Sequence, residues 1–162
     1  MNIKGLFAFA VVVLTGVLNV EAEEKVAVVN PSSTFLNVLN TKRLAMGHAA
    51  VCYNSKLTSA AQWLADDNAK NDKVKTTGSD GSNATTRYKA VSMQPTKSAE
   101  LVAGGQNSVE TVLEAWNNGP SSNLFEDFQL IGLGYTFNAT STYKHYWVLD
   151  LASADNEFCD TV

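Results

Sequence analysis

The chain has 162 residues, with 12 Lys or Arg and 16 Asp or Glu, which gives a formal net charge of −4. The basic residues are scattered and form no stripe, so the composition argues against nucleic acid as a partner. The length suits one domain that buries a substantial hydrophobic core.

The first 22 residues have the pattern of a secretory signal peptide. Lys4 precedes an apolar run from Leu6 to Leu18, and the residues up to Ala22 suit a cleavage site. A membrane anchor is the alternative, but a run of about 13 residues is too short to span a bilayer. We therefore expect residues 1–22 to be removed, residues 23–162 to form one domain with no membrane span, and the protein to be secreted.

Helical periodicity begins after Pro31. Ser32 or Ser33 can cap this first predicted helix, and Gly47 is a natural stop at its end. The apolar residues that would share one face of it are Phe35, Val38, Leu39 and Met46. The strongest helical pattern then opens at Asn54 or Ser55 and continues through KLTSAAQWLADDNAKND, with apolar residues at i, i+3, i+4 and i+7.

The stretch SAELVAGGQ indicates a brief strand or loop. A third helix is predicted for SVETVLEAWNN, with Asn107 or Ser108 as its cap and Glu110 in capping-box spacing after Asn107. Gly119-Pro120 would end this helix. The remaining part of the chain changes its hydrophobic period from helical to alternating.

Two alternating segments, residues 130–137 and 144–152, predict strands, with NATSTY between them as a hairpin loop. In the first strand the glycines Gly132 and Gly134 lack the third glycine of a dinucleotide motif and lie inside a strand. They are better explained by the close approach of a neighbouring element. Helices followed by strands predict an α+β fold with an antiparallel sheet.

Cys52 and Cys159 are the two cysteines of the chain. An even count in a secreted chain favours a disulfide, with two free buried thiols as the alternative. Two sequons, at Asn83 and Asn138, lie in polar, turn-rich segments and are candidate glycosylation sites.

The stretch KTTGSDGSNATTR, residues 75–87, has no large apolar side chain. A Ca²⁺ loop would need alternating ligands and a closing Glu, which the stretch lacks. Asp80-Gly81 instead predicts a turn. The stretch therefore fits a loop on the rim of a site within one continuous domain.

Three titratable residues are candidates for chemistry. His48 follows a helix stop and His145 opens a predicted strand, and neither has a nucleophile beside it in the sequence. We therefore interpret His145 as an edge-strand side chain, and His48 in the same way. Glu100 has apolar neighbours, so it is either a partly buried acid with a raised pKa or a solvated glutamate at a strand edge.

Four segments taken in order resemble the CAP superfamily of cysteine-rich secretory proteins, antigen 5 and pathogenesis-related proteins. They are NTKRLAMGHAAVCYNSKLTSAAQWLADDNA, TTGSDGSNATTR, AELVAGGQNSVETVLEAWNNGP and FQLIGLGYTF with HYWVLDLA. The likeness spans about residues 33–152 and is closer to the short, cysteine-poor branch of the family. It implies an α-β-α sandwich with a central antiparallel sheet.

Many members of that superfamily hold two histidines and one or two acids in a central cleft, often with a divalent metal. Carried onto this chain, the histidine positions fall on Thr76 and near Ser122, and the acid positions fall on Glu100 and Gly119. Only Glu100 keeps the family's residue type. One carboxylate and two hydroxyls are a poor ligand set for a transition metal, so we expect no metal and no cofactor.

The resemblance supports two hypotheses of different classes. One is a secreted, non-enzymatic module that binds a lipid-like or sterol-like molecule, or a host or cell-wall component. The other is a hydrolase, peptidase-like, that uses Glu100 with Ser122 or Thr76. We favour the first, because no histidine remains in the degenerate cleft to transfer protons at neutral pH. The sequence leaves the ligand and the oligomeric state open.

Overall fold

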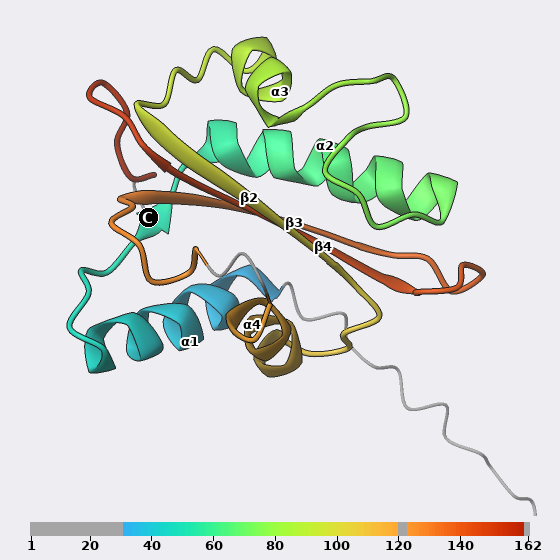
Figure 1. The fold of residues 1–162 in the computed structure, drawn as a ribbon, viewed down its shortest axis with the longest axis horizontal. Coiled ribbons are helices and arrows are strands. Elements are labelled where there is room, and N and C mark those ends of the chain that lie inside the picture. Colours follow the sequence, from blue (N-terminus) through green and yellow to red (C-terminus); the bar gives the residue numbers. More distant parts are fainter. Residues whose placement is uncertain (1–30, 120–122, 161–162) are drawn as a thin grey trace, which may run out of the picture.

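The computed structural model describes residues 31–119 and 123–160, which form three layers around a central sheet (Figure 1). Helices α2 and α3 cover one face of the sheet, and helices α1 and α4 cover the other. In chain order the elements are α1 (Pro31–Ala45), β1 (Cys52–Tyr53), α2 (Ser55–Asn71), α3 (Ala84–Ala90), β2 (Lys97–Gly104), α4 (Val109–Asn117), β3 (Leu130–Phe137) and β4 (His145–Ser153). The predicted signal peptide, residues 1–22, lies outside the described residues.

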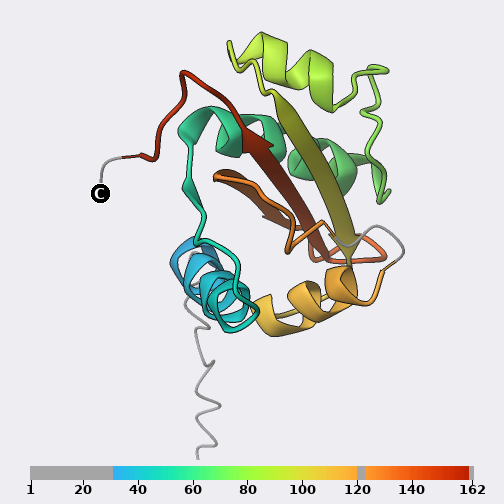
Figure 2. The same cartoon turned by 60° about the vertical axis from the view of Figure 1, so that its left-hand side comes forward.

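The sheet has the strand order β1-β3-β4-β2, so β3 and β4 lie in its interior (Figure 2). The three long strands pair antiparallel, as the sequence predicts, and the fold is α+β. The two-residue strand β1 pairs parallel with β3, which makes the sheet mixed. No sequence pattern indicates β1, because two residues are too few to show a period.

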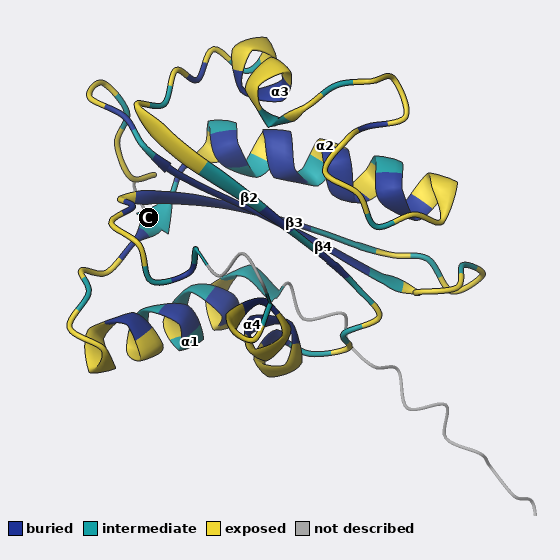
Figure 3. Cartoon of the chain, viewed as in Figure 1, coloured by how far each residue is buried: buried dark blue, intermediate teal, exposed yellow. Residues whose placement is uncertain are grey.

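The main hydrophobic core lies between the sheet and helices α1 and α4. Alternate residues of the interior strands point into it, including Ile131 and Leu133 from β3 and Leu149 and Leu151 from β4. This is the alternation that predicted both strands. Both interior strands are buried along most of their length (Figure 3). In the described residues no helix has the length and apolarity that crossing a membrane would need.

Helix α2 packs directly against the two glycines of β3. A Cβ added at Gly132 would lie 2.1 Å from the backbone carbonyl carbon of Leu57, and one at Gly134 would lie 2.3 Å from the backbone oxygen of Ala61. Backbone atoms on the facing helix cannot rotate away as a side chain can. The prediction that these glycines allow a close approach is therefore confirmed.

The helix ends agree only in part with the sequence predictions. Asn54 caps α2, its side chain accepting the backbone N–H groups of Lys56 and Leu57. Ser32 and Ser33 lie inside α1, so neither caps it. The expected capping box from Asn107 to Glu110 is wrong.

The cap of α4 is Ser108, which forms a box with Thr111. Of the two predicted caps, Asn107 and Ser108, the structure therefore has Ser108, and the helix begins at Val109. The short helix α3 was not predicted. It begins within the polar stretch at residues 75–87, where Asn83 caps it in a box with Thr86.

Two long-range connections fix the loops around the sandwich. The guanidinium of Arg43 is fully buried and donates to the backbone oxygens of Ala49, Leu124 and Glu126. Cys52 and Cys159 form the predicted disulfide, which holds the C-terminal segment beside β1. The hydrogen bonds from Arg43 satisfy backbone oxygens in segments outside the helices and strands. The disulfide fixes the C-terminal segment in a similar way, by a covalent bond.

Gly132→Ala tests the close approach of α2 to β3. The added methyl group would overlap helix backbone, so we expect the free energy of unfolding to fall by about 3 kcal/mol or more. Urea unfolding measures the change. Gly119→Ala is the matched control, because its Cβ would lie 3.4 Å from the nearest atom. Equal stability of the two variants would contradict the packing described above.

Candidate functional site

A cleft of about 430 Å³ opens between β2 and α4. Thr76, Glu100 and Gly119, three of the four positions carried over from the family, all contribute to its lining. The fourth, Ser122, lies outside the described residues. The other lining residues are Leu101, Val102, Ala103, Gln106, Ala115 and Trp116. Most of this surface is therefore apolar.

Glu100 lies on β2, and its carboxylate is bound by Arg87 of α3. The Arg87 Nη2 lies 2.8 Å from one carboxylate oxygen and 2.6 Å from the other. The side chains are only 4% and 5% exposed, for Arg87 and Glu100 respectively. The interpretation of Glu100 as a solvated glutamate is therefore wrong. The carboxylate is buried and its charge is compensated.

Arg87 also connects this carboxylate to the loop that precedes α3. Its guanidinium donates to the Ser82 hydroxyl at 3.1 Å and to the backbone oxygen of Thr76 at 3.0 Å. The cap at Asn83 starts the helix so that Arg87, four residues later, turns toward the sheet. Sequence reasoning missed this role. The available signal was that Arg87 closes the family-like stretch TTGSDGSNATTR.

Asp150 of β4 lies opposite Glu100 in the register of the sheet and is fully buried. Tyr88 donates a hydrogen bond of 2.9 Å to its Oδ1. Burial, and then the charge of Glu100, raises the pKa of the Asp150 carboxyl well above its usual range. A hydrogen-bond interaction with the Glu100 side chain raises the pKa of Asp150 further. An acidic residue within the apolar strand VLDLA was the missed sequence signal.

Arg87, Glu100 and Asp150 form one buried cluster, in which the raised pKa of Asp150 favours its neutral form. One positive charge and one negative charge remain, and they contact each other. This arrangement avoids the large cost of burying two ionised carboxylates with a single cation. It also leaves Glu100 with little capacity to act as a general base toward a molecule in the cleft.

The cleft residues do not fit a transition-metal site of the kind that many family members hold. The described lining has one carboxylate, already bound by Arg87, and otherwise amide, hydroxyl and apolar groups. Imidazole or thiolate would be needed for tight binding. Within residues 31–119 and 123–160, no three His, Cys, Asp or Glu side chains gather as potential ligands.

Both histidines lie away from the cleft. His48 is half-buried and stacks on Phe125. The Nδ1 of His145 lies 2.9 Å from the Tyr135 hydroxyl, and burial followed by the charge of Lys144 lowers its pKa. His145 opens β4, which is an interior strand, so the prediction of an edge-strand side chain is wrong.

The sequence profile of the family described as "CAP: Cysteine-rich secretory protein family" matches residues 36–151. The chain belongs to this family. The match covers more than half of the chain and includes all or most of every element from α1 to β4. The family resemblance stated from the sequence motifs is therefore confirmed. No curated protein sequence matches the chain.

Three solved structures share the fold. An outer surface protein from Borrelia burgdorferi has a TM-score of 0.69 at 17% identity, over 77% of this chain and 93% of that one. An extracellular protein containing a SCP domain from Bacillus anthracis has a TM-score of 0.64 at 14% identity, over 75% of this chain and 40% of that one. A cysteine-rich secretory protein from Staphylococcus aureus has a TM-score of 0.59 at 18% identity, over 79% of this chain and 41% of that one. At these identities the likeness establishes the CAP fold alone.

Asp150→Asn tests the protonated acid. Because the folded-state pKa of Asp150 is raised, its stabilising contribution is complete below the unfolded pKa and is lost as the pH rises through the folded pKa. Asn keeps a donor for Glu100 and an acceptor for Tyr88 but does not titrate. We expect the stability of the variant, relative to wild type, to rise from about pH 4 to about pH 7.

Urea unfolding at several pH values measures this difference. Asp155→Asn, at an exposed carboxylate, is the control and should show no comparable trend. A stability difference between Asp150→Asn and wild type that does not change with pH would contradict a neutral Asp150.

Proposed function

We propose that this CAP protein is a secreted, non-enzymatic module that holds a small apolar molecule in the cleft between β2 and α4. The observation that supports it most is the neutralised carboxylate of Glu100 within an otherwise mainly apolar lining. Pockets of about 300–1,000 Å³ with apolar walls and few polar groups are typical of small-molecule sites. The cleft, at about 430 Å³, falls within that range.

Three observations support an extracellular location. The N-terminal residues have the pattern of a signal peptide, and the chain uses both cysteines in one disulfide. Disulfides persist mainly in oxidising compartments. Two of the structural neighbours are named as outer surface or extracellular proteins, and a third is named as secretory.

The alternative function is a hydrolase that uses Glu100 with Thr76 or Ser122. Glu100 lies in the cleft, as that function requires, but both of its oxygens accept from Arg87. A general base must reach the proton that it abstracts, and a nucleophile needs a base beside it. Thr76 accepts a hydrogen bond from Arg87 through its backbone oxygen and not through its hydroxyl. These contacts favour the binding module.

Ala115→Trp tests binding in the cleft. Ala115 is an exposed residue of α4 that lines the cleft, so the indole would fill the space without entering the core. We expect wild type to bind cis-parinaric acid or dehydroergosterol, and the variant to bind at least about tenfold more weakly because the ligand would overlap the indole. Ligand fluorescence measures both affinities.

Ala45→Trp, at an exposed position of α1, is the matched control for that experiment. It should bind both probes as wild type does. If neither probe binds wild type, or if the two variants bind equally, the apolar cleft proposal fails.

Peptide-library hydrolysis tests the alternative function. We expect no turnover by wild type, because the carboxylate is held by Arg87. Hydrolysis that falls at least about 100-fold in Thr76→Val, Ser122→Ala or Glu100→Gln would establish catalysis and overturn the proposal. Thr76→Val is the cleanest variant, since it retains the backbone oxygen that binds Arg87. Circular dichroism must show that Glu100→Gln is folded, because it leaves a buried cation unpaired.

The sequons provide a separate test of secretion and of exposure. Asn83 is exposed, whereas Asn138 is half-buried and donates its side-chain N–H to the backbone oxygen of Ala69 at 3.0 Å. We expect secretion from a eukaryotic host to add a glycan at Asn83 in preference. Mass spectrometry should then show glycan loss in Thr85→Ala and little change in Thr140→Ala. The reverse pattern, or no glycan at either site, would contradict this expectation.

A further inference from the structure

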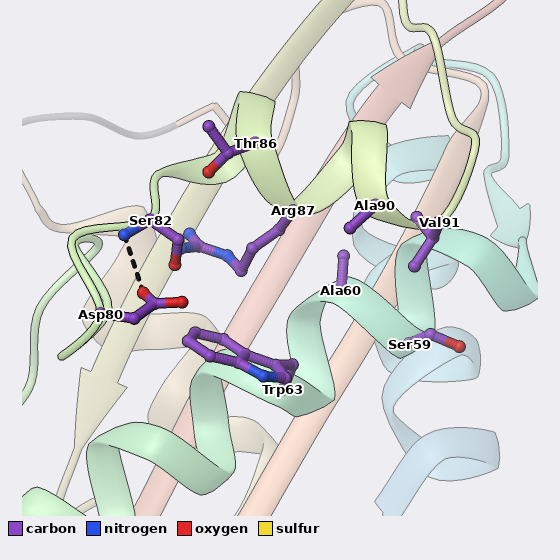
Figure 4. A pocket seen from close by; sticks show the side chains of 9 residues that line it. All are labelled: Ser59, Ala60, Trp63, Asp80, Ser82, Thr86, Arg87, Ala90 and Val91. Carbon is purple, nitrogen blue, oxygen red and sulfur yellow. Dashed lines mark hydrogen bonds between the residues drawn. The ribbon is translucent and has the colours of Figure 1, made fainter.

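A second pocket, of about 310 Å³, lies between α2 and α3, and Arg87 is among the residues that line it (Figure 4). Its floor is the α2 surface at Ala60 and Trp63, and its opposite wall is the α3 surface at Ala90 with the adjoining Val91. The polar residues of its lining are Ser59, Asp80, Ser82, Thr86 and Arg87. Arg87 connects this pocket to the cleft, because it donates hydrogen bonds to Glu100.

Trp63 presents its indole to this pocket and is 41% exposed. The loop before α3 packs on the ring so closely that a Cβ at Gly78 would lie 2.8 Å from Trp63 Cζ3 and 2.8 Å from Asp80 Oδ1. The indole and the Asp80 carboxylate are therefore held next to each other. An indole offers a large apolar area together with a π face, and Trp is enriched where proteins contact other molecules.

Asp80 is fixed in position by its own turn. Its Oδ1 accepts the Ser82 backbone N–H at 2.8 Å, and the Gly78 N–H donates to the Ser82 backbone oxygen at 2.9 Å. In Figure 4 the second carboxylate oxygen points away from Ser82 and toward the indole. Hydrogen bonds from Ser82 lower the pKa of Asp80, so the carboxylate is ionised at neutral pH. It is a preorganised negative charge at the end of an apolar groove.

We propose that this pocket binds a small organic cation with an apolar body, such as an alkylammonium. An ammonium group beside Asp80 would contact the carboxylate and the indole of Trp63 at the same time. Aromatic faces attract cations, and a carboxylate adds charge complementarity. The apolar body would lie along Ala60, Ala90 and Val91, which offer no polar partner through their side chains.

Arg87 also lines the pocket, and its charge is a minor cause of the lowered pKa of Asp80. Its guanidinium carbon lies 5.9 Å from the centre of the Trp63 ring, but its charge is matched by Glu100 in a contact of 2.6 Å. Asp80 is therefore the charge in the lining that has no ion-pair partner among the described residues. An anion would be repelled by it, and a neutral apolar ligand would desolvate it without compensation.

The proposal does not rest on the function proposed for the cleft, because the two pockets share no lining residue and Arg87, which lies between them, is held by Glu100. Either of the two binding proposals can therefore fail while the other holds. Titration of the intact mature protein with hexyltrimethylammonium, followed by calorimetry and tryptophan fluorescence, tests this one. We expect saturable binding that weakens at high salt. We expect at least about threefold weaker binding in both Asp80→Asn and Trp63→Leu.

Control variants and control ligands distinguish binding in this pocket from unspecific attraction of the cation to surface carboxylates and aromatic rings. Asp155→Asn removes an exposed carboxylate elsewhere, and Phe158→Leu removes an exposed aromatic ring elsewhere, so both should bind as wild type does. Hexanoate, hexanol and a methyl glucoside should bind more weakly than the cation. Equal loss in Asp80→Asn and Asp155→Asn, tighter binding of any of these three ligands, or no saturable binding at millimolar concentration would overturn the proposal.

Discussion

The ion pair between Arg87 and Glu100 connects the cleft, the loop before α3 and the pocket at Trp63. It joins α3 to β2, and it holds the loop before α3 through Ser82 and the Thr76 backbone. A buried ion pair is not in itself a source of stability, because both charges lose their hydration. Its consequence here is positional: it holds Glu100, which lines the cleft, against Arg87, which lines the pocket at Trp63.

The raised pKa of Asp150 favours its neutral form, and a neutral Asp150 lets that pair lie far from solvent without a second buried negative charge. Two ionised carboxylates facing each other across β2 and β4 would need more than one cation. With Asp150 protonated, Glu100 receives one hydrogen-bonded acid and one guanidinium. Glu100, the acid that this chain keeps from the family's cleft, is thus paired inside the protein. The fold is retained while the chemistry of the site differs, as is common among large fold families.

The sequence predicted the parts of the fold that depend on local periodicity. The strands at β3 and β4 and the helix α2 have repeating apolar patterns, and the glycines of β3 indicated close packing. Helix α3 was missed because its seven residues, ATTRYKA, carry no apolar period. It is held by tertiary contacts of Arg87 and Tyr88 instead. Propensity alone cannot reveal a short helix of that kind.

The same limit applied to the site. Thr76, Glu100 and Gly119 could be brought to one cleft by family resemblance, but the partner of Glu100 could not be identified from spacing. Arg87 lies 13 residues from Glu100 in sequence, and Asp150 reaches it only through strand pairing. Ion pairs and shared protons depend on distances that are set after folding. Their best sequence signal was an acid within an apolar strand.

The carboxyl carbon of Asp150, observed by NMR across a pH titration, tests the buried cluster most directly. A neutral acid and a carboxylate have distinct carbon shifts, and the assignment can be made by comparison with Asp150→Asn. We expect Asp150 to be still protonated at neutral pH. A signal that titrates near the ordinary value of about 3.9 would contradict it, because both buried carboxylates would then be ionised beside one guanidinium.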